Sequence, residues 1–373
     1  MEKGKERKTG IDCLRIVAMI MILFIHFYGR EALQPEFNLS DGNYYFIIFL
    51  KGMCCVAVNC FFLITGYFTI NKSIKFSKTL KIWGTTLFYT LSFFLVFMFI
   101  RQGQVTGTEV LQSFFPVVTE SYWFITTYIA VSFLSPIICI TIPKLMKKQY
   151  KYLLTTLIII LVIIGQVYPY TGVFNSTTGL NLATMLLMYL IGGYIRLHLN
   201  IKKENSNKYL LGYIIMSLMI FLNAFIMDIL GACFGGIFKL WARKEFAYNS
   251  IFVVASSVLL FLYFASIEIK GKFAKRIIST VQPLIFAVYI MHEDIFVRSK
   301  TLGALKYQNS VWFIPDLFIK ITLLFLVCCF IEYIRQFIGR QFSKLELFKR
   351  IINKVQKLDE IQVKSLSEQC DKQ

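Results

Sequence analysis

The stretch GIDCLRIVAMIMILFIHFYG, residues 10–29, sets the fold class of the chain. It is a nearly unbroken apolar run of about the 20 residues that an α-helix needs to cross a hydrocarbon core. It also holds two ionisable side chains, Arg15 and His26. Basic residues precede it, but no small-residue cleavage site follows, so we predict a retained membrane span rather than a signal peptide.

Further apolar runs follow along the 373 residues, of which 57% are hydrophobic and 16% charged. Soluble domains are closer to half apolar, and none requires many such runs in series. The sequence therefore predicts an all-α, polytopic transmembrane bundle of about ten spans. The predicted spans are Ile11–Gly29, Tyr44–Ile70, Leu80–Ile100, Tyr122–Ile142, Tyr152–Tyr168, Leu180–Leu197, Tyr209–Leu230, Ala247–Ile269, Ile278–Val297 and Val311–Ile334.

Lys and Arg alternate in density between successive loops. The segments before the first span and after the second, fourth, sixth and eighth each hold four, and the tail from Arg335 adds nine, which makes 29 against eight in the other loops. Cytoplasmic loops keep the positive residues. We therefore predict that both termini are cytoplasmic and that the protein is a multi-pass protein of the cell membrane, with the bacterial inner membrane expected.

The same distribution bears on the net charge of +19. Because the cations lie in short clusters between apolar runs, they indicate topology and contacts with anionic membrane lipid, and we predict no nucleic-acid partner. The nine cysteines form no CxxC pair and the three histidines are scattered, so we predict no metal site. No P-loop, Gly-x-Ser-x-Gly or His-Glu-x-x-His motif occurs.

Arg15 and His26 are the leading candidates for chemistry, because ionisable groups inside a span are costly. They are eleven residues apart, which places them on one helix face about 16 Å apart along the axis. Asp12, three residues before Arg15, can pair with it. For each residue alone, snorkelling of Arg15 to lipid headgroups or an interfacial His26 is an equally good interpretation.

Four segments carry a family signature: GIDCLRIVAMIMILFIH from Gly10, with Arg and His separated by ten residues, CFFLITGYF at 60–68, YWFITTYIAVSFLSPII at 122–138 and AVYIMHEDIF at 287–296. Together they resemble the acyltransferase-3 family of integral membrane acyltransferases. The resemblance spans nearly the whole chain, and the length and span number fit the shorter members of the family, which are similar to bacterial surface-polysaccharide O-acyltransferases. It implies transfer of an acyl group, with acetyl expected, from acyl-CoA to a hydroxyl of a surface polysaccharide or its lipid-linked precursor.

Carried over residue by residue, the family's essential pair falls on Arg15 and His26. A sugar hydroxyl needs a base near neutral pH, and His26 has the usual chemistry for that role. We expect the coenzyme phosphates to meet Arg15, Lys78 and Lys81. Acyl-CoA would be a co-substrate, and no permanently bound cofactor is expected.

Candidate acceptor-binding residues lie at the predicted outer ends of spans. Glu120, Tyr122 and Trp123 could contact a sugar ring, although an interfacial aromatic belt gives the same pattern and is favoured. His292 and Glu293, with Asp294 beside them, could orient His26 or the acceptor, or form a solvated rim. Asp228 could partner His26 or pair structurally with another helix.

We predict a transmembrane acyltransferase domain at 1–341 and a cytoplasmic basic tail at 342–373. Two other interpretations remain. A multi-spanning transporter or flippase would use the polar residues as a substrate path, but we find no repeats or matching interrupted helices. A structural or export subunit for a polysaccharide precursor would tolerate substitution of both Arg15 and His26.

Overall fold

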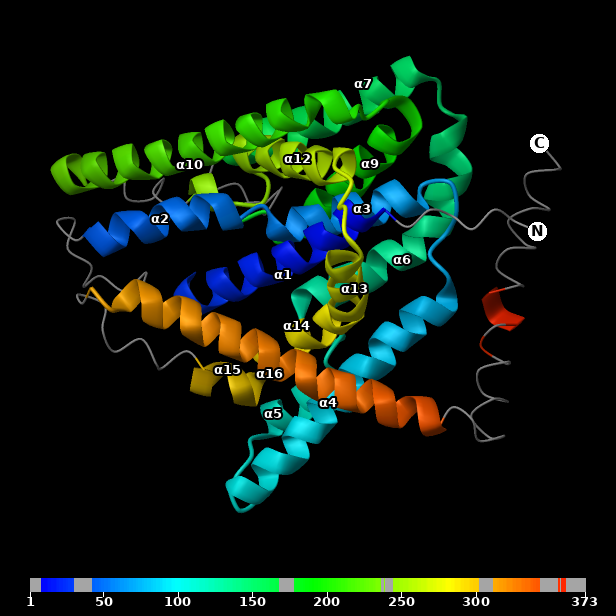
Figure 1. The fold of residues 1–373 in the computed structure, drawn as a ribbon, viewed down its shortest axis with the longest axis vertical. Helices are drawn as coiled ribbons and strands as arrows, with labels where there is room; N and C mark the ends of the chain where they lie inside the picture. The colour runs from blue at the N-terminus through cyan, green and yellow to red at the C-terminus, as the bar shows by residue number, and fades with distance from the viewer. Residues whose placement is uncertain are drawn as a thin grey trace. The chain divides into compact units, whose positions relative to one another are not determined.

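The computed structural model describes residues 8–29, 42–167, 178–235, 238, 244–301, 311–342, 355 and 357–359. These residues form helices joined by turns, and that part of the chain contains no strand (Figure 1). Among the described residues, seven helical stretches are long and apolar enough to cross a membrane. The predicted all-α polytopic fold is therefore confirmed.

A helix lies at each of the ten predicted spans, but the ten are not alike. The sixth and eighth are helices of 17 and 16 residues, short for a span. The fifth consists of a helix, a π-helical segment and a final helical turn. The number of spans and the cytoplasmic placement of the termini stay predictions. Of the predicted tail, 343–354, 356 and 360–373 lie outside the described residues.

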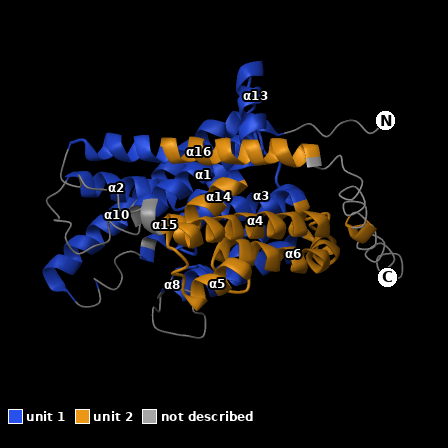
Figure 2. Cartoon of the chain, turned by 90° about the horizontal axis from the view of Figure 1, so that it is seen from below, with its two compact units in different colours: residues 1–68, 147–285, 307–321 blue, residues 69–146, 286–306, 322–373 orange. Residues whose placement is uncertain are grey.

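The chain divides into two compact units, which we describe separately (Figure 2). The first unit comprises residues 1–68, 147–285 and 307–321. Its helices are α1 (Thr9–Gly29), α2 (Gly42–Cys54), α3 (Ala57–Thr69), α7 (Lys147–Ile158), the π segment Ile159–Ile164, α8 (Gly165–Val167), α9 (Leu182–His198), α10 (Ser206–Phe234), α12 (Ile251–Ser266) and α13 (Lys272–Val281).

The second unit comprises residues 69–146, 286–306 and 322–373. It holds α4 (Phe76–Ile100), α5 (Gly107–Phe114), α6 (Trp123–Thr141), nearly all of α14 (Ile285–Glu293), and α15 (Ile295–Thr301). The long helix α16 (Phe313–Phe342) contributes its first residues to the first unit and the rest to the second. Short 3₁₀ turns lie at Ile142–Lys144, Lys203–Asn205, Lys244–Phe246 and Gln282–Leu284.

Two predicted spans are interrupted in the structure. The second is broken at Cys55 and Val56, between α2 and α3. The ninth is broken by the 3₁₀ turn at 282–284, between α13 and α14. Pro283 explains this second break, because proline has no backbone N–H to donate within a helix and its ring crowds the preceding turn.

In the first unit, α10 packs along α12 and α2, and α1 packs against α2, α12 and α13 (Figure 1). Helices α3 and α9 approach each other closely at two glycines. A Cβ at Gly66 would lie 1.8 Å from the carbonyl oxygen of Tyr189, and one at Gly192 would lie 2.2 Å from that of Leu63. Only glycine fits at either position, so these two residues fix how the two helices cross.

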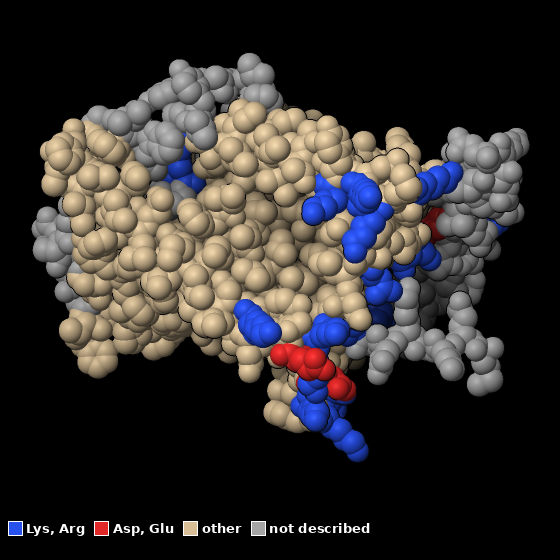
Figure 3. All heavy atoms as spheres, turned by 90° about the horizontal axis from the view of Figure 1, so that it is seen from above, with Lys and Arg blue, Asp and Glu red and all other residues tan. Residues whose placement is uncertain are grey.

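The surface matches a membrane protein. On the face drawn in Figure 3, Lys and Arg side chains gather in patches and a broad area carries no charged side chain. Helix α10 exposes Leu211, and α16 exposes Ile319 and Leu323. In water such apolar surface would be a liability, whereas lipid is a suitable solvent for it.

The glycine crossing yields a test of the fold. Gly66→Ala would place a methyl group inside the Tyr189 backbone, so α3 and α9 must separate, and overpacking of this kind costs about 1–3 kcal/mol. We expect a lower melting temperature for the purified, detergent-solubilised variant. The matched control is Gly84→Ala in α4, where a Cβ would have no neighbour within 4 Å and helix propensity improves. Equal melting of the two variants would contradict the crossing.

Candidate functional site

The N-terminal part of α1 carries an ion pair inside an apolar helix. Arg15 donates to Asp12 at 2.5 Å, and the two side chains are 24% and 8% exposed. The pairing predicted from their spacing is therefore present. The Arg15 guanidinium also lies 5.5 Å from the ring centre of Phe68, near the end of α3. Asp12 and Phe68 together fix where this charge sits.

His26 lies in the last turns of the same helix and is half-buried. Three turns of helix separate it from Arg15, so one helix face presents a guanidinium near one end and an imidazole about 16 Å away. A partner for this imidazole was predicted in Asp228 on α10. In the structure, Asp228 accepts a hydrogen bond from the Tyr44 hydroxyl on α2, which is the structural pairing that the sequence left open. A role for Asp228 beside His26 stays a prediction.

In the second unit, the end of α14 is a buried polar cluster. His292, Glu293 and Asp294 are 4%, 5% and 2% exposed, so the alternative of a solvated rim is wrong. The Tyr122 hydroxyl donates to Asp294 at 2.9 Å. This bond joins the start of α6 to the end of α14, and it places one candidate acceptor-binding residue against the cluster that holds two others.

A hydrogen bond to the backbone indicates which nitrogen of the His292 ring carries a hydrogen. Its Nδ1 lies 2.6 Å from the carbonyl oxygen of Val288, one helical turn earlier. Because a carbonyl oxygen only accepts hydrogen bonds, we assign the hydrogen to Nδ1. The second ring nitrogen, Nε2, is then the atom that is not used in this bond. The Tyr289 ring packs edge-on against His292 and also contacts Tyr122 and Phe124. Glu293 lies 3.6 Å from Arg298.

The sequence singled out His292, Glu293 and Asp294 but gave no role to Tyr289 of the same segment. The available signal was the Tyr-x-x-His spacing, which places Tyr289 and His292 one helical turn apart. The Tyr122–Asp294 bond had no such signal, because it joins residues 172 positions apart.

The other predicted residues are more exposed. Glu120 is exposed and has a positive φ of 53°, and Trp123 is half-buried with its ring 6.4 Å from that of Phe124. Both are compatible with the favoured aromatic-belt interpretation. Lys78 and Lys81 are exposed in the first turns of α4, where Lys78 lies 5.7 Å from the ring centre of Tyr128. Their contact with coenzyme, like the absence of a metal, stays a prediction.

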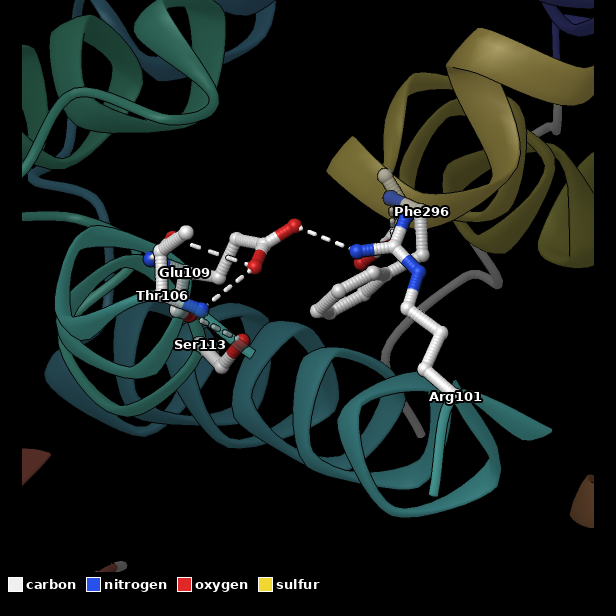
Figure 4. Close-up of polar contacts among 6 residues, drawn as sticks. Arg101, Thr106, Glu109, Ser113 and Phe296 are labelled. Atoms are coloured by element: carbon white, nitrogen blue, oxygen red, sulfur yellow. Dashed lines mark hydrogen bonds and ion pairs between the residues drawn. The ribbon is translucent and has the colours of Figure 1, made fainter. Parts of the chain in front are cut away.

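A second polar contact anchors the segment that follows His292. In Figure 4, the Arg101 side chain at the end of α4 reaches Glu109 of α5 at 2.7 Å and lies 5.4 Å from the ring centre of Phe296 on α15. Glu109 and Thr106 cap the start of α5 reciprocally. The backbone N–H of Thr106 and the Arg101 guanidinium together hold the pKa of Glu109 below its usual range, although partial burial opposes the shift.

Helices that suit a membrane, with an ion pair and a histidine on one of them, define a helical membrane protein with candidate catalytic groups on a candidate span. The acyltransferase-3 family model, described as "Acyltransferase domain", matches residues 8–333. The chain therefore belongs to this family of membrane acyltransferases. No curated protein and no solved structure matches it.

The corner drawn in Figure 4 yields a prediction with a defined pH dependence. Glu109→Gln removes the charge that accepts from Arg101 and Thr106, so we expect a loss of roughly 0.5–1 kcal/mol at pH 7, seen as a lower melting temperature. Because the pKa of Glu109 is lowered on folding, this contribution is complete above about pH 4.3 and fades as the pH falls below that value.

The control for this variant is Glu120→Gln, an exposed carboxylate in the same connection between α4 and α6. It should melt like the wild type at both pH 7 and about pH 3.5. A Glu109→Gln variant as stable as the wild type at pH 7, or a deficit that grows on acidification, would contradict the geometry.

Proposed function

We propose that the chain is an O-acyltransferase that moves an acyl group, with acetyl expected, from acyl-CoA to a hydroxyl of a cell-surface polysaccharide or its lipid-linked precursor. We place it in the bacterial inner membrane. The observation that carries the proposal is helix α1, which holds Arg15 in place through Asp12 and carries His26 three turns further along. Membership of an acyltransferase family supports the reaction class.

The chemistry follows from these groups. The His26 imidazole takes the proton of the acceptor hydroxyl as its oxygen attacks the thioester carbonyl carbon. The C–O bond forms, the C–S bond breaks, and the coenzyme thiolate leaves and recovers the proton from the imidazolium. No metal, oxidant or covalent enzyme intermediate is needed for the balance of this step.

The separation within α1 suits a donor with two chemically different ends. The phosphates of coenzyme A are polyanionic and cytoplasmic, and a guanidinium is well matched to phosphate oxygens. With the phosphates at Arg15, the thin pantetheine arm can run along the helix and deliver the thioester toward His26. Trp123, Tyr122, Glu120, His292 and Glu293 stay candidates for the acceptor side.

The direct test replaces the base. In cells that express equal amounts of membrane-inserted protein, His26→Ala should abolish acylation of the surface polysaccharide, measured by mass spectrometry. The matched control is His198→Ala, which removes a histidine from the end of α9 that packs on Tyr150 and Tyr194 and has no proposed part in the reaction. Acylation that persists in His26→Ala, or disappears equally in both variants, would refute the assignment.

A second test concerns the donor. In membrane vesicles supplied with varied acyl-CoA, Arg15→Ala should raise the KM for acyl-CoA by about tenfold or more, the effect of losing a charge-assisted contact. The KM of Arg15→Lys should lie between those of the wild type and Arg15→Ala, because lysine keeps the charge and loses the planar guanidinium. An unchanged KM in Arg15→Ala would show that this arginine has a purely structural role.

A further inference from the structure

A second group of cations lies near Arg15 in the first unit and plays no part in the mechanism above. Lys8, just before α1, and Arg196, in the last turn of α9, converge on the hydroxyl of Tyr67 in α3. The Lys8 Nζ atom lies 2.6 Å from this oxygen and a guanidinium nitrogen of Arg196 lies 3.3 Å from it. Both cations also lie over the Tyr67 ring, at 4.9 and 5.2 Å from its centre.

The packing of three helices builds this group. Tyr67 directly follows Gly66, and Arg196 lies one turn beyond Gly192, so the glycine crossing of α3 and α9 brings the two side chains together. A Cβ at Gly10 would lie 2.2 Å from the Phe264 carbonyl oxygen, which fixes the start of α1, two residues after Lys8, against α12. The cations are therefore positioned by rigid elements and not by a loose surface chain.

The two positive charges of the group share one neutral acceptor. Tyr67 offers one neutral oxygen, and Lys8 and Arg196 have only donors, so two like charges are drawn to a single acceptor. Their nitrogens can be no further apart than the 2.6 Å and 3.3 Å of these two bonds together. Within the described ranges, no carboxylate forms an ion pair with either cation. An anion between them would turn repulsion into two charge-assisted hydrogen bonds.

The position of the group suits the donor of the proposed reaction. Tyr67 is 4% exposed and forms the buried base, while Lys8 and Arg196 are exposed to solvent. The next residue, Phe68, lies against both the Tyr67 ring and the Arg15 guanidinium. Asp12 already balances the charge of Arg15, whereas the pair on Tyr67 has the capacity to hold a doubly charged group.

We propose that Lys8, Arg196 and Tyr67 form a binding site for a phosphate monoester, and that its occupant is the ribose 3′-phosphate of coenzyme A. This occupant rests on the function proposed above. A monoester dianion matches two cations and one hydroxyl, and the sequence places all three at the cytoplasmic end of their helices, where coenzyme A is found. A lipid headgroup with a terminal phosphate presents the same chemistry, so the experiment separates the two sources.

The experiment measures binding and requires no acceptor. The full chain is purified into phosphatidylcholine nanodiscs, and the dissociation constants of coenzyme A and 3′-dephospho-coenzyme A are compared. The wild type should bind coenzyme A about tenfold or more tightly than the dephospho form. The double variant Lys8→Gln/Arg196→Gln should bind both probes with about the affinity that the wild type has for the dephospho form, which also shows that the variant remains folded.

The matched control is Lys203→Gln/Lys208→Gln, which removes the same charge from two exposed lysines of the first unit, one in the 3₁₀ turn before α10 and one in the first turn of α10. This control variant should bind coenzyme A more tightly than 3′-dephospho-coenzyme A, as the wild type is expected to do. A general effect of net charge would weaken both double variants equally and would overturn the site.

The remaining outcomes are distinct. A wild type that binds both probes equally keeps the acyl-CoA donor and overturns this site, whereas a wild type that binds neither overturns the donor and the site together. A second arm uses nanodiscs that contain phosphatidic acid. If the Lys8 and Arg196 variant loses enrichment of that lipid while the coenzyme preference persists, the occupant is a lipid headgroup and the coenzyme assignment is wrong.

Discussion

Inside a hydrocarbon core there is no water to satisfy a polar group, and this constraint shapes the whole protein. It makes every span a helix, because a helix bonds its own backbone. It also requires each ionisable side chain in a span to find a partner within the protein. Asp12 meets this need for Arg15, Tyr44 donates to Asp228, and Glu332 of α16 accepts from Tyr89 and Arg335.

His26 is the second ionisable group of α1 that the proposed reaction uses. It shares a helix with the Asp12–Arg15 pair, so one rigid element sets the distance between the cation and the imidazole. An arrangement of this kind can hold a long donor by its charged end while its reactive end reaches a base further into the membrane. The buried cluster of Tyr122, His292 and Asp294 provides the second unit with polar groups suited to an acceptor.

The sequence predicted the local features well, because they depend on spacing along one helix. All ten predicted spans contain helix, and the Asp12–Arg15 pair follows from an interval of three residues. The break before α14 was not predicted, although Pro283 is a residue type that interrupts a helix. Contacts between distant segments could not be derived in this way. The Tyr122–Asp294 bond and the meeting of Lys8, Arg196 and Tyr67 depend on helix packing, which the apolar pattern of each span does not specify.

We propose that the protein itself transfers the acyl group from coenzyme A to a glycan hydroxyl. The most direct measurement supplies the purified protein with acetyl-CoA labelled with carbon-13 at the acetyl carbonyl, together with surface polysaccharide whose esters have been removed by mild base. Carbon-13 NMR should show an ester carbonyl growing on the glycan as free coenzyme thiol is released in equal amount. Release of thiol without a glycan ester, or label that stays on the coenzyme, would show that the protein does not transfer the acyl group to the glycan.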